Sequence, residues 1–131
     1  MSTSFHAVLW IDHQTARILQ FDAEHVQVDT VRTHHHTHHT HHTHSDGKRD
    51  AQTFYGEVCD SLEGIGEVLV VGPQTGISDF KNFADKHRPQ VAEHLVAFEP
   101  MAAASEGQLI AKAREFFIRY DQMAGVTLPR G

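Results

Sequence analysis

The chain has 131 residues, of which 40% are hydrophobic, and this is the size and composition of one domain with a single core. Its formal net charge of −6 with neutral histidines argues against nucleic-acid binding over the whole surface, while leaving local basic patches open. A single cysteine excludes an internal disulfide, and the absence of a signal peptide or a membrane-length apolar run predicts a cytoplasmic protein.

Three short segments at the start of the chain have the pattern of strands. Residues 5–12 form a compact apolar run, and residues 15–22 and 25–32 alternate apolar with polar side chains. The connections between them are too short for anything but hairpins. We therefore expect an antiparallel meander of three strands.

After residue 50 the hydrophobic period changes to that of helices. A stripe indicates a helix from about Asp50 to Gly64, and residues 67–72 form a strand apolar enough to be covered on both faces. Ser78 is the expected N-cap of a second helix that Pro89 closes. Residues 94–99 form the fifth strand.

The last predicted helix has clear boundary signals. Ser105 and Gln108 have the spacing of a capping box, and Gly125 is a natural stop. One broad face is apolar, and we expect this face to pack on the sheet. It comprises Leu109, Ile110, Ala113, Phe116, Phe117 and Tyr120.

The predicted element order is βββαβαβα, within one domain that spans residues 1–131. A strand that follows a helix usually joins its neighbour in parallel through a right-handed crossover. We therefore predict an α/β fold with a mixed five-stranded sheet in the order 3-2-1-4-5. Strand 2 is antiparallel to both neighbours, and helices cover the faces. This is the ribonuclease H-like layout.

A histidine-rich loop is expected at residues 33–50, and it begins with the tract THHHTHHTHHTH. Neutral imidazole is a good ligand for zinc and nickel, although the tract has no fixed ligand spacing. We expect this loop, rather than the core, to bind the metal. The alternative is a low-complexity loop that binds metal only as any polyhistidine does. The candidate ligands are His34, His35, His36, His38, His39, His41, His42 and His44.

The same loop has a charge that depends on pH. Adding eight protons to the formal charge of −6 gives +2, and histidine ordinarily titrates near pH 6.5. Together with Lys48 and Arg49, the protonated histidines would then form a basic surface that can contact the phosphates of an RNA backbone. The alternative is a solvated loop without a partner.

Other residues that could be catalytic lack the partner side chains that a reaction would require. Asp12 follows a strand, as the metal-binding acid of a nuclease would, but setting the turn after that strand is the better interpretation. Cys59 and Trp10 are expected in the core, and no Walker lysine follows Gly72, which argues against a nucleotide. The remaining acids near strand ends are Asp22, Asp79 and Glu99.

VVGPQTGISDF, at residues 70–80, resembles a stretch of the central domain of the archaeal and eukaryotic release factor and of its relative Pelota. In that family a strand runs into Gly-Pro-Gly, a short loop, and Asp-Phe at the start of a helix. Gly72, Pro73, Asp79 and Phe80 match at that spacing. The resemblance implies the translation-machinery version of the ribonuclease H-like fold.

The departures from the family pattern concern its activity. The release factor carries Gly-Gly-Gln, which promotes peptidyl-tRNA hydrolysis, where this chain has residues 33–50. Gln74 and Ile77 stand where the family usually has Gly and Lys. The resemblance therefore implies a stand-alone, bacterial-type relative that is not a release enzyme.

Two functions of different classes follow. The first is a non-enzymatic module of the translation machinery that binds the ribosome or tRNA through the loop and the Lys48–Arg49 end. The second is a metal-binding protein that acts through the histidine-rich loop. An enzyme is the third choice, because the sequence specifies no base–nucleophile pair and no cluster of acids.

Overall fold

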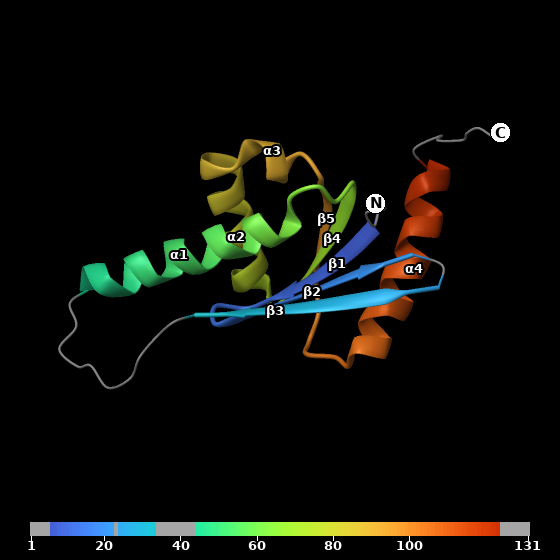
Figure 1. Ribbon diagram of the computed structural model, residues 1–131, viewed down its shortest axis with the longest axis horizontal. Helices are drawn as coiled ribbons and strands as arrows, with labels where there is room; N and C mark the ends of the chain where they lie inside the picture. Colours follow the sequence, from blue (N-terminus) through green and yellow to red (C-terminus); the bar gives the residue numbers. More distant parts are fainter. Residues whose placement is uncertain (1–5, 23, 34–43, 124–131) are drawn as a thin grey trace.

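The computed structural model describes residues 6–22, 24–33 and 44–123, with side chains from residue 51 to 121 in the last range (Figure 1). These residues form five strands and four helices. In chain order they are β1 (His6–Ile11), β2 (Thr15–Phe21), β3 (Val26–Arg32), α1 (His44–Leu62), β4 (Glu67–Gly72), α2 (Gln74–His87), α3 (Pro89–Ala92), β5 (Leu95–Pro100) and α4 (Glu106–Met123).

The five strands form one mixed sheet in the order β3-β2-β1-β4-β5, which confirms the predicted fold. β2 pairs antiparallel with β1 and β3, whereas β4 pairs parallel with β1 and β5. His6 lies opposite Glu67, and Trp10 lies opposite Val71. The sheet therefore has two distinct ends. We call the end where β1 and β4 start the His6 end, and the end where they finish the Gly72 end.

The two hairpins of the meander use the same turn chemistry. Asp12 Oδ1 accepts hydrogen bonds from the backbone N–H groups of Gln14 and Thr15, both at 2.8 Å. Asp22 does the same in the β2–β3 hairpin, at 2.8 and 2.7 Å, and these bonds lower the pKa of its carboxyl group. A short carboxylate that satisfies the turn's own backbone favours a tight reversal. The predicted role of Asp12 in its turn is confirmed.

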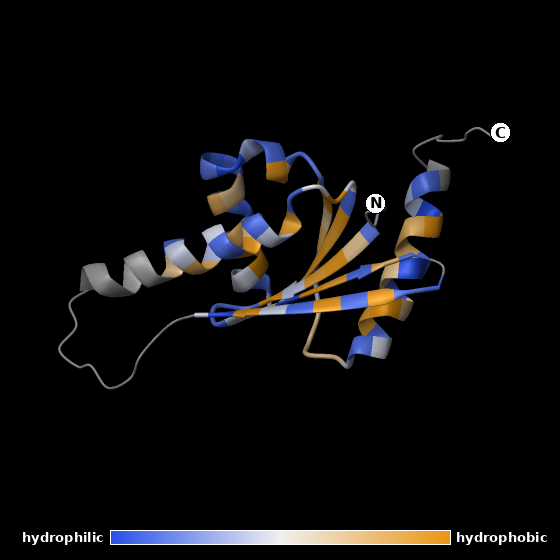
Figure 2. Cartoon of the chain, in the orientation of Figure 1, coloured by the Kyte–Doolittle hydropathy of each residue, from blue (hydrophilic) through white to orange (hydrophobic). Residues whose placement is uncertain are grey.

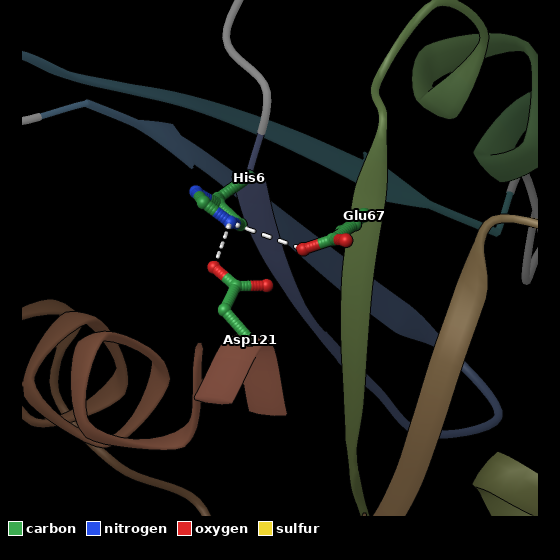
Figure 3. A group of neighbouring side chains, drawn as sticks. All are labelled: His6, Glu67 and Asp121. Atoms are coloured by element: carbon green, nitrogen blue, oxygen red, sulfur yellow. Dashed lines mark hydrogen bonds and ion pairs between the residues drawn. The ribbon is translucent and has the colours of Figure 1, made fainter. Parts of the chain in front are cut away.

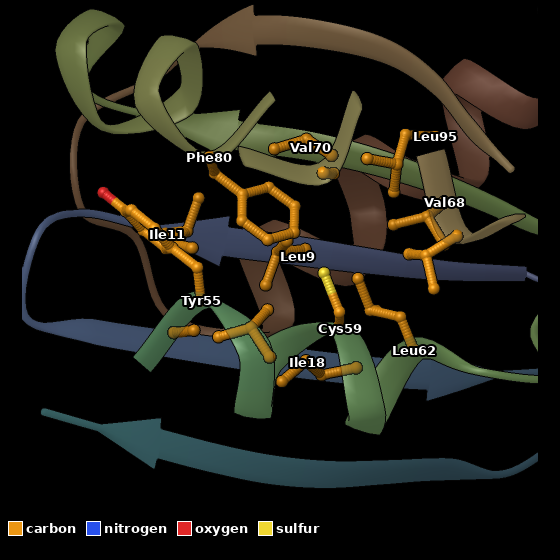
Figure 4. Packing of buried hydrophobic residues seen from close by; sticks show 14 of the residues in the cluster. Leu9, Ile11, Ile18, Tyr55, Cys59, Leu62, Val68, Val70, Phe80 and Leu95 are labelled. Atoms are coloured by element: carbon orange, nitrogen blue, oxygen red, sulfur yellow. The ribbon is translucent and has the colours of Figure 1, made fainter. Parts of the chain in front are cut away.

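One face of the sheet is covered by α1 and α2 (Figures 1 and 4). The apolar strand side chains on this face pack against apolar residues of the two helices. Figure 2 shows the hydrophobic colouring along the strands and on parts of these helices. Cys59 lies fully buried among them, and burial raises the pKa of its thiol to about 11, so it is a packing residue as predicted. Members of this cluster include Leu9, Ile11, Ile18, Phe54, Leu62, Ile77 and Phe80.

The opposite face is covered by α4. Phe117 is 3% exposed against the sheet, Phe116 is partly buried beside it, and Trp10 is buried in the same cluster, so all three predictions are confirmed. Ser105 N–H donates to Gln108 Oε1 at 2.9 Å, and Gln108 N–H donates to Ser105 Oγ at 3.1 Å. This reciprocal pair is the predicted capping box. Gly125 lies outside the described residues.

Two helix boundaries differ from the prediction. The helix expected from Asp50 already begins at His44, so the predicted loop 33–50 is too long. The first turns of α1 extend beyond the sheet (Figure 1). Because this part of the helix has no sheet to pack against, the hydrophobic stripe starts only after it. Ser78 is not an N-cap, because α2 begins at Gln74, directly after the extended residue Pro73.

The short helix α3 was not predicted. Pro89 ends α2 as expected, but its fixed φ also suits the first turn of a new helix, and α3 begins there. Arg88, at the junction, donates from Nη2 to Asp60 Oδ1 at 2.6 Å and to the Gly56 carbonyl at 3.3 Å. These contacts hold the α2–α3 junction against α1. In the described part of the chain, no helix has the length and apolar character needed to cross a membrane.

Candidate functional site

The matched family motif lies at the Gly72 end of the sheet. Gly72 ends β4 with φ +143°, and a Cβ atom built on it would lie 2.3 Å from the Ile11 carbonyl oxygen. A Cβ on Gly76, one turn into α2, would lie 2.9 Å from Asp12 Cα. Both positions therefore need glycine, because the end of β4 and the first turn of α2 pass directly against the end of β1.

The remaining motif residues divide between packing and the surface. Phe80 is fully buried beneath the helix, where its ring lies 5.8 Å from that of Tyr55 (Figure 4). Asp79 is exposed, and its Oδ2 lies 2.8 Å from His13 Nε2 in the β1–β2 turn. The motif thus brings a histidine and a carboxylate together across 66 positions of sequence. His13 was not among the predicted site residues, since only the tertiary fold places it beside Asp79.

The histidine tract leaves the sheet from this same end. Thr33, at the end of β3, donates its backbone N–H to the Gln14 carbonyl at 3.0 Å. Seven of the predicted metal ligands, His34, His35, His36, His38, His39, His41 and His42, lie outside the described residues. His44, Lys48 and Arg49 are in α1, which corrects their placement in a loop.

Two buried side chains of α1 carry ionisable groups. The Tyr55 side chain is 6% exposed, and burial raises the pKa of its phenol to about 12, with smaller contributions from the negative charges of Asp79 and Asp12. The phenol therefore stays protonated at neutral pH and cannot act as a general base there. Together with the buried Cys59 thiol, it belongs to the core rather than to a reaction centre.

The four acids considered for a nuclease do not converge. Asp12 and Asp79 lie at the Gly72 end, whereas Asp22 follows β2 at the His6 end. Glu99, on β5, forms an ion pair with Lys112 at 2.7 Å. A two-metal nuclease centre needs several carboxylates around a shared pair of ions, and these positions do not provide one.

A second group of side chains lies at the His6 end (Figure 3). His6 Nε2 lies 3.1 Å from Glu67 Oε1 and 3.8 Å from Asp121 Oδ2. These residues come from β1, β4 and α4, respectively, and one ligand atom of each lies within 4.8 Å of the others. No local sequence pattern points to this group, because positions 6, 67 and 121 come together only through strand register and helix packing.

The described residues thus have an α/β fold with a mixed five-stranded sheet in the order β3-β2-β1-β4-β5. A scan against protein-family models finds no match for the sequence, and a search of the curated proteins finds none either. Solved structures do match, and they include a translation termination factor and a termination-like factor.

Pelota from Archaeoglobus fulgidus superposes with a TM-score of 0.60 and 18% identity, over 91% of this chain and 35% of that one. The archaeal translation termination factor aRF1 gives a TM-score of 0.57 at 10% identity, over 92% and 42% of the two chains. Dom34 from S. cerevisiae gives 0.54 at 7% identity, over 94% and 36%. The chain thus spans well under half the length of these proteins, and identities this low establish the shared fold alone.

Proposed function

We propose that this domain is a non-enzymatic component of the translation apparatus that binds the ribosome or tRNA through its Gly72 end. The observation that carries the proposal is the fold shared over 91% of the chain with Pelota, together with the Gly72-Pro73 and Asp79-Phe80 motif at one end of the sheet. Among the matched structures, aRF1 is a translation termination factor, and Dom34 is a termination-like factor of RNA quality control.

The local arrangement supports RNA binding at this end. The histidine tract begins at Thr33, beside the β1–β2 turn, and His13 is exposed in that turn. The two nearby acids are engaged by protein groups. Asp12 accepts two backbone N–H groups, and Asp79 faces His13. Protonation of the tract would therefore add positive charge at an end where the acids already have partners.

Binding should depend on pH and salt in a defined way. Partial protonation of the tract histidines should make association stronger at pH 6 than at pH 8. Contacts with phosphates release counterions, so affinity should fall steeply as salt rises. Lys48 and Arg49 stay charged across this range, and their loss should weaken binding at both pH values.

The test is quantitative binding to purified ribosomes and to tRNA across that pH and salt range. Lys48→Ala with Arg49→Ala should reduce binding. Lys112→Ala with Arg119→Ala removes the same charge from α4, on the other face of the sheet, and should leave binding unchanged. A peptidyl-tRNA hydrolysis assay should give no activity, because the chain has no Gly-Gly-Gln. The proposal would be overturned if the protein bound neither ribosomes nor tRNA under any of these conditions.

The second candidate function is metal binding by the tract. It is favoured by one observation, the eight histidines within residues 33–44. An all-imidazole loop should bind zinc or nickel with little selectivity, and this binding should tolerate high salt, unlike a phosphate contact. Nickel calorimetry on the whole chain, with and without Gln at the eight positions, measures this capacity. Tight nickel binding combined with no ribosome or tRNA binding would favour this function over the first.

A further inference from the structure

We propose that His6, Glu67 and Asp121 form a second, separate metal site that binds one zinc ion at the His6 end of the sheet. This inference concerns described residues far from the histidine tract, and it does not depend on the proposed role in translation. It rests on the geometry of three side chains, on the elements that hold them, and on the cavity beside them.

The spacing of the ligand atoms fits a small divalent ion. Zinc binds imidazole nitrogen and carboxylate oxygen at about 2.0 to 2.2 Å, so the ligands of a tetrahedral site lie roughly 3.3 Å apart. His6 Nε2 is 3.1 Å from Glu67 Oε1 and 3.8 Å from Asp121 Oδ2. The three ligand atoms lie within 4.8 Å of one another. Small side-chain movements would therefore suffice to enclose the ion (Figure 3).

The elements that carry these side chains are fixed by the core. His6 and Glu67 lie directly opposite each other in the parallel β1–β4 register. Phe117, buried in the core, precedes Asp121 by four positions on α4, so both lie on the helix face turned to the sheet. The His6 ring also packs against Phe117, with ring centroids 4.3 Å apart. Such support limits how far the ligands can move without a metal.

The donor set selects the class of metal. One imidazole with two carboxylates suits zinc and similar transition metals, whereas calcium and magnesium prefer oxygen ligands alone. Three protein ligands leave a fourth tetrahedral position for water or a small ligand. His6 and Asp121 also line a cavity of about 390 Å³, together with Phe21, Phe117 and Arg114, and the open position would face this space.

The three side chains also affect one another's ionisation. Burial, the negative charge of Asp121 and a hydrogen bond with Asp121 raise the pKa of Glu67 to about 7. Burial lowers the pKa of His6, although the charge of Asp121 opposes that shift. A metal ion bound by both carboxylates would take the place of the proton that Glu67 and Asp121 share.

The experiment must separate this site from the tract. We would use the full chain with Gln at all eight tract histidines and titrate it with zinc chloride by calorimetry. The expected result is one zinc per chain. Glu67→Gln and Asp121→Asn should each weaken binding at least tenfold, and His6→Gln should abolish it. The matched control is Asp79→Asn, which alters a histidine–aspartate pair at the Gly72 end, His13–Asp79, and should leave zinc affinity unchanged.

Two further measurements keep the test decisive. Cobalt in place of zinc should give the visible absorption of a tetrahedral site in the tract-free chain and not in its Glu67→Gln variant. Zinc should also raise the thermal midpoint of the tract-free chain, because a ligand that binds only the folded state stabilises it. Circular dichroism verifies that each variant is folded. The proposal is overturned if the tract-free chain binds no zinc, or if folded Glu67→Gln and Asp121→Asn variants bind it as tightly as their parent.

Discussion

His13 Nε2 lies 2.8 Å from Asp79 Oδ2, and this pair joins the β1–β2 turn to α2 at the Gly72 end of the sheet. Both side chains are about half exposed, so solvent screens their interaction. We expect Asp79→Asn to lower the free energy of unfolding by less than about 1 kcal/mol in urea denaturation. Asp85→Asn, which breaks the equally exposed Lys81–Asp85 pair on the same helix, is the control and should have a similar effect. A much larger loss for Asp79→Asn would identify its contact as structural.

Gly72→Ala should be strongly destabilising. The backbone at Gly72 has φ +143°, and the new methyl group would lie 2.3 Å from the Ile11 carbonyl oxygen. We expect a loss on the order of 3 kcal/mol in the free energy of unfolding, measured by urea denaturation. Gly107→Ala is the control, because a Cβ there meets nothing within 4 Å and helical alanine is favoured over glycine. Equal stability of the two variants would contradict the close approach of β4 to β1.

Ser105→Ala should remove the cap of α4. Ser105 Oγ accepts the Gln108 N–H at 3.1 Å, and loss of such a bond costs about 1 kcal/mol. Ser78→Ala provides the comparison, since Ser78 lies inside α2 and its Oγ only accepts an exposed bond from Gln74 Nε2 at 3.3 Å. We expect thermal unfolding of Ser78→Ala to match the parent. If the two substitutions had the effects reversed, the observed start of α2 would be wrong.

Stability should fall at alkaline pH through Tyr55. The folded protein holds the pKa of this phenol at about 12, above its ordinary value of 10. Between these values the unfolded chain releases the proton while the folded chain keeps it, so the free energy of unfolding decreases as pH rises from 10 to 12. Below pH 10 this contribution is constant.

Tyr55→Phe removes the ionising group and keeps the ring. Its free energy of unfolding should therefore fall less steeply over that interval, by an amount on the order of 2 kcal/mol. Parallel urea titrations at pH 10, 11 and 12 measure the difference between the two proteins. Identical slopes would show that the phenol ionises as readily in the folded protein as in the unfolded chain.

The parts of the fold that depend on local patterns could be predicted from the sequence. Alternation in residues 15–22 and 25–32 defines strands, and hairpins as short as these fix their antiparallel pairing. The crossover rule then places β4 and β5 on the other side of β1. The cap at Ser105 was predictable for the same reason, since its partner lies only three positions away.

Features that depend on distant contacts were missed. Ser78 has a side chain suited to an N-cap, but α2 begins earlier, directly after the extended residue Pro73. The capping preference of serine therefore does not decide where this helix starts. The pair of His13 with Asp79 arises only when α2 packs against the end of β1. Likewise, His6 and Glu67 become neighbours only through a parallel register set by the core, which no local motif encodes.

The order of elements along the chain also bears on how the protein is made. In the described residues, α4 is the last element, and it covers the sheet face formed by Val8, Trp10 and Leu19. Synthesis proceeds from the N-terminus, so all five strands leave the ribosome before α4, the helix that covers this face. During that interval the newly made sheet presents an apolar surface that invites association with other chains. A chain ending at Pro100 should therefore aggregate instead of persisting as a smaller folded unit.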